Sequence, residues 1–228
     1  MMRIGFFISL ACLAAACALA AWGWMATPEG AQLPVHFNAS GEADRYGSKA
    51  EAFLTAPAFL AGLTFLMMII PRIDPRGGNV RRSRVVLLAG WIICAFVLLG
   101  VQAMMTYLAL GGIIPPDTMA TGVAVMVSVV MIVLGLVIAR ARPNFFVGVR
   151  TPWTLSSDLS WDKTHRWASR VFLAIGLAGL LSLVFLPPAH VTIALITALL
   201  TGSLGLAVYS WWVWKNDPNR ETLTPDDA

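Results

Sequence analysis

Charged residues are scarce in this chain of 228 residues. Only 12% are Asp, Glu, Lys or Arg, whereas 58% are hydrophobic; an ordinary soluble domain carries about 25% charge. The high apolar content excludes a disordered chain. No charged side chain lies within six long apolar runs, which excludes a soluble fold with a charged outer face on every helix. The runs are 4–25, 53–70, 85–110, 120–139, 171–186 and 191–214.

Cysteines and recognisable catalytic motifs are also scarce. Cys12, Cys17 and Cys94 lie inside apolar runs and form no Cys-x-x-Cys pair, so neither a disulfide framework nor a zinc site is expected. The chain has no His-Glu-x-x-His, no nucleophile elbow and no Gly-rich phosphate loop. We therefore expect no cofactor and no enzymatic activity. The runs hold almost no ionisable group, which argues against an ion-coupled transporter.

The apolar runs predict an all-α membrane protein with six transmembrane helices. A bilayer core about 30 Å thick needs roughly 20 apolar residues of helix. The run 171–186 is the shortest, and an interfacial segment is the alternative there. The first run is preceded by Arg3 and has small residues near 18–20, and secretory signal peptides share both features. Because its apolar sequence continues to Met25, we expect an uncleaved anchor.

Basic residues indicate that both termini are cytoplasmic. With this orientation, 14 of the 16 Lys and Arg residues lie on the inner side, and only Arg45 and Lys49 lie outside. The net charge of +4 is then an orientation signal, and no direct nucleic-acid partner is expected. The inner cluster Arg81, Arg82 and Arg84 is expected to contact anionic membrane lipids.

The spans divide the chain into five parts. They are the first two helices with an outer segment 26–52 (1–70), helices three and four (71–139), an inner segment (140–170), helices five and six (171–214) and a polar tail (215–228). In the loop before helix three, Pro71, Pro75 and Gly77-Gly78 are expected to break helix. The tail from Asn216 onward is expected to be mobile.

The outer segment 26–52 is long and chemically mixed, which predicts a structured outer loop. Residues 33–37 are expected to be extended, because Pro34 biases its predecessor away from helix. Turns are expected at 38–41 and 46–48.

The candidate metal ligands of the outer segment are His36, Glu42 and Asp44. Their spacing matches no known ligand pattern and contains a single imidazole. We therefore expect no metal, and a hydrogen-bonded structural histidine under a folded cap is the favoured interpretation.

The inner segment 140–170 begins at Pro143, which stops the fourth helix, and continues through a turn at 151–153. The candidate caps of a following helix are Thr154, Ser156 and Ser157. Over 158–170, helical spacing puts Trp161, Thr164, His165 and Ala168 on neighbouring faces. This pattern predicts a short amphipathic helix that lies along the inner leaflet.

The two polar segments resemble known families. The inner pattern Asn144-x-x-x-Gly148-x-Arg150-Thr151-Pro152-Trp153-Thr154-Leu155, followed by Trp161-x-x-Thr164-His165-Arg166, is similar to the signature of the SdpI family of bacterial membrane proteins. The outer pattern Leu33-Pro34-x-His36-Phe37-Asn38-x-x-Gly41-x-x-Asp44-x-x-Gly47-Ser48-Lys49 resembles the uncharacterised outer domain often found N-terminal to it.

The resemblance implies a bacterial inner-membrane protein. The family is named for immunity against a secreted peptide toxin, and a member can also signal by holding a cytosolic transcriptional repressor at the membrane. The outer residues that would meet a toxin or partner are His36, Asn38, Gly41, Asp44, Gly47 and Lys49. The inner residues that would contact a partner or brace the bundle are Asn144, Gly148, Arg150, Thr151, Pro152, Trp153, Thr154, Trp161, Thr164, His165 and Arg166. A transporter or a lipid- or envelope-acting protein is the alternative.

Overall fold

The structure is a computed structural model that describes residues 2–220. These residues are mostly helical and form two compact units, each described by itself. The first unit holds the chain up to Met68, together with Gly90–Ala124 and Phe185–Ile193. The second holds Ile69–Ala89, Val125–Val184 and the chain from Ala194.

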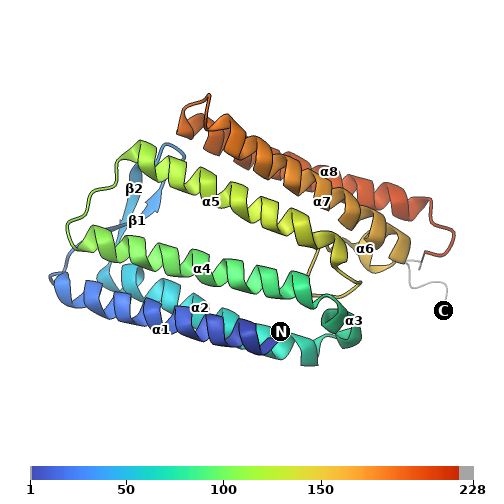
Figure 1. Ribbon diagram of the computed structural model, residues 1–228, viewed down its shortest axis with the longest axis horizontal. Coiled ribbons are helices and arrows are strands. Elements are labelled where there is room, and N and C mark those ends of the chain that lie inside the picture. Colours follow the sequence, from blue (N-terminus) through green and yellow to red (C-terminus); the bar gives the residue numbers. More distant parts are fainter. Residues whose placement is uncertain (1, 221–228) are drawn as a thin grey trace. The chain divides into compact units, whose positions relative to one another are not determined.

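The elements follow one another as labelled in Figure 1. They are α1 (Met2–Ala26), β1 (Leu33–Phe37), β2 (Ala43–Gly47), α2 (Lys49–Ile73), α3 (Gly77–Arg82), α4 (Arg84–Ala109), α5 (Pro116–Val137), the 3-10 turn η1 (Ile138–Arg140), α6 (Pro152–Leu155), α7 (Asp158–Ser182) and α8 (Pro188–Lys215).

Within residues 2–220, five helices are long and apolar enough to cross a membrane: α1, α2, α4, α8 and the stretch Pro116–Arg140 formed by α5 and η1. Each has 25 to 28 residues, and a helix of 25 residues is roughly 37 Å long at about 1.5 Å per residue. The chain is therefore a multi-pass membrane protein, as the apolar runs predicted.

The expected break of the chain at Pro71 is wrong. The α2 helix continues through Pro71 to Ile73, and the Asp74 N–H still bonds to the Ile70 carbonyl at 3.1 Å. The expected break at Gly77-Gly78 is wrong as well, because this pair begins α3. The expected break at Pro75 is confirmed, because the helix ends at Ile73, just before Asp74-Pro75, and proline disfavours helical backbone in the residue before it.

The fifth predicted span has different bounds. The α7 helix runs without interruption from Asp158 to Ser182, so 158–170 is the first half of this helix and not a separate amphipathic helix. Nothing in the sequence breaks helix between Arg170 and Val171, so the polar and apolar stretches join. Only 171–182 of the predicted run 171–186 is helical, and α7 is not among the five candidate spans.

The first unit has a core of small and apolar side chains between α1, α2 and α4. One cluster contains Cys12, Ala16, Leu60 and Ala95. Beside it the Thr64 hydroxyl donates to the Leu60 carbonyl at 2.7 Å. The Ser9 hydroxyl lies 2.5 Å from the Thr64 oxygen, and because the Thr64 proton is already used, Ser9 donates to Thr64. Hydroxyl pairs of this kind stabilise helix contacts in a membrane. Cys12 is buried, whereas Cys17 and Cys94 are exposed.

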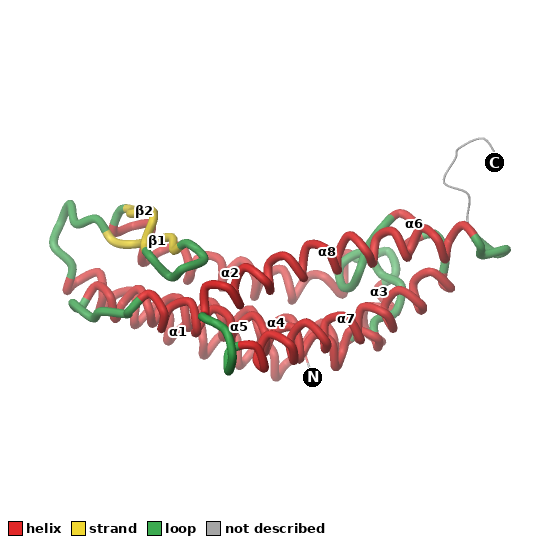
Figure 2. Tube along the Cα trace, turned by 90° about the horizontal axis from the view of Figure 1, so that it is seen from above, coloured by secondary structure: helices red, strands yellow, loops and turns green. Residues whose placement is uncertain are grey.

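The outer segment forms an antiparallel hairpin of β1 and β2 (Figure 2). Leu33, Val35 and Phe37 alternate along β1 and pack against the buried Phe53 and Met105, as the two-residue period of a strand requires. The extended stretch 33–37 and the turn at 38–41 are confirmed. The turn expected at 46–48 is wrong in part, because β2 runs to Gly47.

Gly41 closes the hairpin turn at a position that only glycine fits. Its φ is +83°, and a Cβ there would lie 2.1 Å from the carbonyl oxygen of Pro116, at the start of α5. The hairpin turn therefore approaches the α5 backbone directly, within the first unit.

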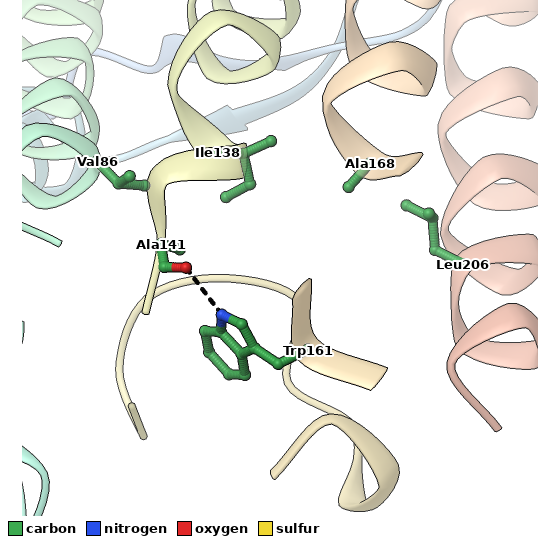
Figure 3. Packing of buried hydrophobic residues seen from close by; sticks show 6 residues of the cluster. All are labelled: Val86, Ile138, Ala141, Trp161, Ala168 and Leu206. Carbon is green, nitrogen blue, oxygen red and sulfur yellow. Dashed lines mark hydrogen bonds between the residues drawn. The ribbon is translucent and has the colours of Figure 1, made fainter. Parts of the chain in front are cut away.

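The second unit is organised around Trp161, which is fully buried. Its cluster also contains Val86 of α4, Ile138 of η1, Ala168 further along α7 and Leu206 of α8 (Figure 3). The indole Nε1 donates to the Ala141 carbonyl at 2.9 Å. The single polar atom of this large side chain is therefore paired, as burial of a tryptophan requires.

Helices α7 and α8 lie side by side in this unit (Figure 1). A Cβ on Gly202 would lie 3.2 Å from Val171. Gly176, by contrast, faces α5, because a Cβ there would lie 2.5 Å from the Ser128 carbonyl oxygen.

We expect Gly41→Ala to lower the thermal unfolding temperature of the purified protein more than Gly30→Ala does. Both glycines have positive φ, but nothing lies within 4 Å of a Cβ at Gly30. The Gly30 change should cost about 1–2 kcal/mol from backbone strain alone, and the Gly41 change adds the clash with Pro116. Equal shifts in the two unfolding temperatures would contradict the close approach.

Candidate functional site

The candidate site is the signature segment, defined as residues 144–166, which includes α6 and the first third of α7. It lies wholly in the second unit. Between η1 and α6 the chain has no regular secondary structure, so its backbone polar groups need partners other than a helix or sheet.

Asn144 supplies several of these partners at once. Its side chain is fully buried. The Oδ1 atom accepts from the N–H groups of Phe146 at 2.9 Å and Val147 at 2.7 Å, and Nδ2 donates to the carbonyls of Arg142 at 2.7 Å and Val147 at 3.1 Å. All the donor and acceptor groups of this amide are therefore used to fix the loop, and a carboxylate could not donate to the two carbonyls.

Residues in α3 and on either side of it hold the start of the segment and the two residues that precede it. The buried Asp74 accepts from the Arg76 N–H at 2.6 Å through Oδ1 and from the Phe145 N–H at 3.0 Å through Oδ2. Asn79 donates to the Pro143 carbonyl at 2.9 Å. Ser83 Oγ accepts from the Arg142 N–H at 2.8 Å.

His165 connects α7 to the loop through both ring nitrogens. Nε2 accepts the Val149 N–H at 3.0 Å, so the ring proton is on Nδ1, which donates to the Trp161 carbonyl at 2.8 Å. Burial lowers the pKa of His165, against smaller raising effects of the Trp161 carbonyl and the Asp162 carboxylate. The ring is also stacked on Trp161, with centroids 4.2 Å apart.

Gly148 allows this approach. Its φ is +123°, and a Cβ would lie 2.3 Å from His165 Nε2. A glycine is therefore required here both by the backbone conformation and by the histidine that lies against it.

Thr151 and Thr154 form a reciprocal cap on α6. Thr151 Oγ1 accepts from the Thr154 N–H at 3.1 Å, and Thr154 Oγ1 accepts from the Thr151 N–H at 2.9 Å. Thr151 also lies 2.9 Å from the hydroxyl of Ser210 on α8, and Ser160 donates to the Ser210 carbonyl at 2.8 Å. The turn predicted at 151–153 is thus a capped helical turn tied to α8.

Ser157 caps α7, as one of the three predicted candidates. It accepts from the Ser160 N–H at 2.9 Å and donates to Asp217 Oδ2 at 2.5 Å. This bond from Ser157 is the main reason that the pKa of Asp217 lies below its ordinary value, and the Asn219 N–H adds to it. Asp217 is buried, so the expectation of a mobile tail is wrong at this residue; the rest of that expectation, 221–228, lies outside the described residues.

The structure divides the predicted inner residues into two groups. The buried ones are Asn144, Thr154, Trp161, Thr164 and His165, whereas Gly148, Thr151 and Trp153 are half-buried. The exposed ones are Arg150, Pro152 and Arg166. One guanidinium nitrogen of Arg150 donates to the Phe145 carbonyl at 2.5 Å. A partner of this segment can therefore reach few of its signature residues.

The outer hairpin forms a second candidate surface, in the first unit. His36 Nδ1 lies 2.6 Å from Asp44 Oδ1 across the two strands, and both side chains are exposed. The expected hydrogen-bonded histidine is confirmed, but it lies on the surface and not under the cap. Arg45 pairs with Glu51 at 2.6 Å.

The remaining predicted outer residues fix the shape of the hairpin. Asn38 Oδ1 accepts from the N–H groups of Ser40 at 2.9 Å and Glu42 at 3.1 Å. Gly41 and Gly47 are buried at close contacts.

Lys49 makes contacts at the base of the hairpin. This lysine is 9% exposed, pairs with Glu29 at 2.8 Å and lies 5.0 Å from the centroid of the Trp24 ring. Within residues 2–220 no group of three or more His, Cys, Asp or Glu side chains is placed to hold a metal ion.

Five residues of the inner network were missed by the sequence interpretation: Asp74, Asn79, Ser83, Ser210 and Asp217. Two of them carry a local signal, since both aspartates precede a proline. Each accepts from the backbone N–H two residues on, at 2.6 Å for Asp74 and 2.9 Å for Asp217, and so forms an Asx turn. The second carboxylate oxygen of each turn then binds the signature segment. The sequence indicates the turns but not this long-range contact.

The candidate spans, the folded hairpin and the buried inner network define a multi-pass membrane protein with two ordered segments between its spans. Residues 140–210 match the SdpI/YfhL protein family, and residues 11–61 match a domain of unknown function, DUF1648. The chain therefore carries an SdpI/YfhL family domain preceded by a DUF1648 domain, as the two motifs predicted. No curated protein and no solved structure matches the chain.

We expect the protein to lose stability as the pH falls below about 6.5, the ordinary pKa of histidine. The folded state holds His165 neutral, so the unfolded chain binds the proton first and unfolding becomes more favourable at lower pH. Protonation would also leave Nε2 facing the Val149 N–H with no lone pair to accept it. Thermal unfolding measured between about pH 7.5 and 5.5 checks this.

The matched variants for this measurement are His165→Gln and His36→Gln. His165→Gln should reduce the pH dependence, because glutamine does not titrate, whereas His36→Gln on the hairpin should retain it. Identical pH profiles for the unmodified protein and the His165→Gln variant would contradict the assignment.

Proposed function

We propose that this protein is a non-enzymatic immunity protein of the bacterial inner membrane that protects the cell against a secreted, membrane-active peptide toxin. The observation that carries the proposal is the outer hairpin, a rigid polar surface fixed on apolar helices. The SdpI/YfhL match over 140–210 supports it through the role for which that family is named.

The hairpin is suited to recognition because its two faces differ. Leu33, Val35 and Phe37 hold one face on the helices. The other face exposes His36 and Asp44, together with Tyr46, a residue that is 58% exposed. A tyrosine combines apolar area with a hydroxyl and is enriched at protein interfaces. A peptide would therefore find apolar and charged groups on a preformed support.

In this proposal both termini are cytoplasmic and the apolar part of α7 crosses the membrane, which gives six spans. This span would begin near Val171, because the first half of the helix carries Asp158, Asp162, Lys163, Arg166 and Arg170. The charge distribution along the sequence supports the orientation, since 14 of 16 basic residues fall on the inner side.

A non-enzymatic role is supported by the state of the polar groups in the signature segment. Both nitrogens of His165 are bonded to backbone groups, and Thr154 Oγ1 donates to the Val149 carbonyl at 2.9 Å. These side chains hold the segment together, so their use in proton transfer would require breaking it.

Signalling through a cytosolic transcriptional repressor is the second candidate function. Arg150 favours it, because its exposed guanidinium has five N–H donors and the contact to Phe145 uses one of its nitrogens. The half-buried Trp153 is three residues further on. Arginine and tryptophan together are typical of residues that dominate binding energy at interfaces.

Reporter fusions test the topology. Alkaline phosphatase fused after His190 should be active, because the connection from α7 to α8 would lie outside the cytoplasm. Green fluorescent protein fused after the C-terminus should fluoresce, because that end would be cytoplasmic. An inactive phosphatase fusion at His190, at normal membrane abundance, would exclude α7 as a span.

Survival under toxin challenge tests the immunity role. In a deletion strain exposed to a panel of secreted peptide toxins, the unmodified protein should restore growth against at least one. The triple variant His36→Ala, Asp44→Ala, Tyr46→Ala should not, while remaining in the membrane, since exposed pairs contribute only about 0–1 kcal/mol to stability. Equal survival with and without the protein across the panel would rule out immunity.

The control is Arg150→Ala combined with Trp153→Ala. This variant should protect as well as the unmodified protein, because it leaves the hairpin intact. If the second function holds as well, the same variant should no longer recover a repressor from cell extracts, whereas the hairpin variant still should. Loss of protection in both variants would contradict the separation of the two surfaces.

A further inference from the structure

Five arginines line one open hollow of about 930 Å³ in the second unit. They come from three elements and the stretch that follows: Arg81 and Arg82 from α3, Arg84 from the first residue of α4, Arg140 from η1 and Arg142 shortly after it. Gly78, Asn79 and Ala139 complete the lining, so no carboxylate is among the lining residues.

The positive charge of this hollow is almost uncompensated. Among residues 2–220, Arg142 alone of the five forms an ion pair, and its nitrogen lies 3.9 Å from Asp162. All five side chains are exposed. Like charges gathered at one place repel one another, so the hollow gains stability from an anion that lies between them.

The walls of the hollow are held at a fixed separation. Asn79 of α3 donates to the Pro143 carbonyl at 2.9 Å, and Ser83, between α3 and α4, accepts from the Arg142 N–H at 2.8 Å. These two bonds join the α3 wall to the wall that follows η1. The arginines therefore project from a preformed frame and not from a mobile loop.

The hollow lies at the ends of two candidate spans. One span begins at Arg84, and another ends at Arg140. Groups at the ends of spans lie at the depth of the lipid headgroups. Leu136 of α5, four residues before the end of this span at Arg140, is 60% exposed and offers acyl chains an apolar surface near that end.

We propose that this hollow binds the phosphate of an anionic phospholipid. Guanidinium groups hold phosphate oxygens through paired N–H bonds, and basic pockets at the ends of spans bind lipid headgroups. The exposed Leu136 supports a lipid over a soluble phosphate, because an acyl chain can lie on it. The proposal does not depend on the immunity role.

Native mass spectrometry of the purified full chain, titrated with cardiolipin, tests this site. The variant Arg81→Gln, Arg140→Gln should bind cardiolipin about 25-fold more weakly, at about fivefold per charge, which corresponds to roughly 1 kcal/mol per basic residue at an anionic surface. The control Lys163→Gln, Arg170→Gln removes the same charge from exposed positions of α7 outside the hollow. Its affinity should stay within about twofold, since salt screens distant charges.

Two further measurements separate the phosphate site from general attraction to an anionic surface. Arg81→Lys, Arg140→Lys keeps the charge but loses the paired N–H geometry, and it should bind cardiolipin measurably more weakly than the unmodified protein. Inorganic phosphate at the same phosphate concentration should displace little cardiolipin. The proposal is overturned if the glutamine variant and its control bind alike, if the lysine variant binds undiminished, or if inorganic phosphate displaces the lipid.

Discussion

The second unit depends on one constraint: an irregular stretch of chain between η1 and α6 is packed against helices, and its backbone polar groups need partners. Asn144 meets this demand from within the loop, using both atoms of its amide. Asp74, His165 and Thr154 meet it from outside. Gly148 and the buried Trp161 follow from the same demand, because the loop can reach His165 only at a glycine and the indole binds the Ala141 carbonyl.

This arrangement changes what the family signature means in physical terms. Most of its polar residues are used inside the protein, where they hold the loop, α6 and α7 together. The residues left for contact with another molecule are few, with Arg150 foremost among them. The outer hairpin shows the same division: Asn38, Gly41 and Gly47 shape it, and His36 and Asp44 lie on its exposed face. In this chain the motif therefore mainly builds the framework, and the positions open to another molecule are its few exposed ones.

The sequence predicted well what depends on local composition. The apolar runs located five spans, because length and hydropathy are properties of a continuous segment. The strand at 33–37 and the cap at Ser157 also depend on near neighbours. The sequence prediction failed where contacts between residues far apart in the chain determine the structure. No local pattern shows that Asp217 reaches Ser157, sixty residues away in sequence. The continuous α7 was missed for a different reason, since no residue between its polar and apolar halves breaks helix. Charge counting found the arginines of 71–84, but their meeting with Arg140 and Arg142 exists only in the fold.

The two Asp-Pro turns have a consequence for where this domain begins and ends. Asp74 and Asp217 both lie outside the family match at 140–210, yet each binds a group within it: the Phe145 N–H and the Ser157 hydroxyl. Sequence similarity and hydrogen bonding thus draw different boundaries around the same domain. The part of the chain that contains these hydrogen-bond partners as well extends from the end of α2 to the residues after α8. A segment cut at the limits of the similarity would lack two of the carboxylates that its own fold requires.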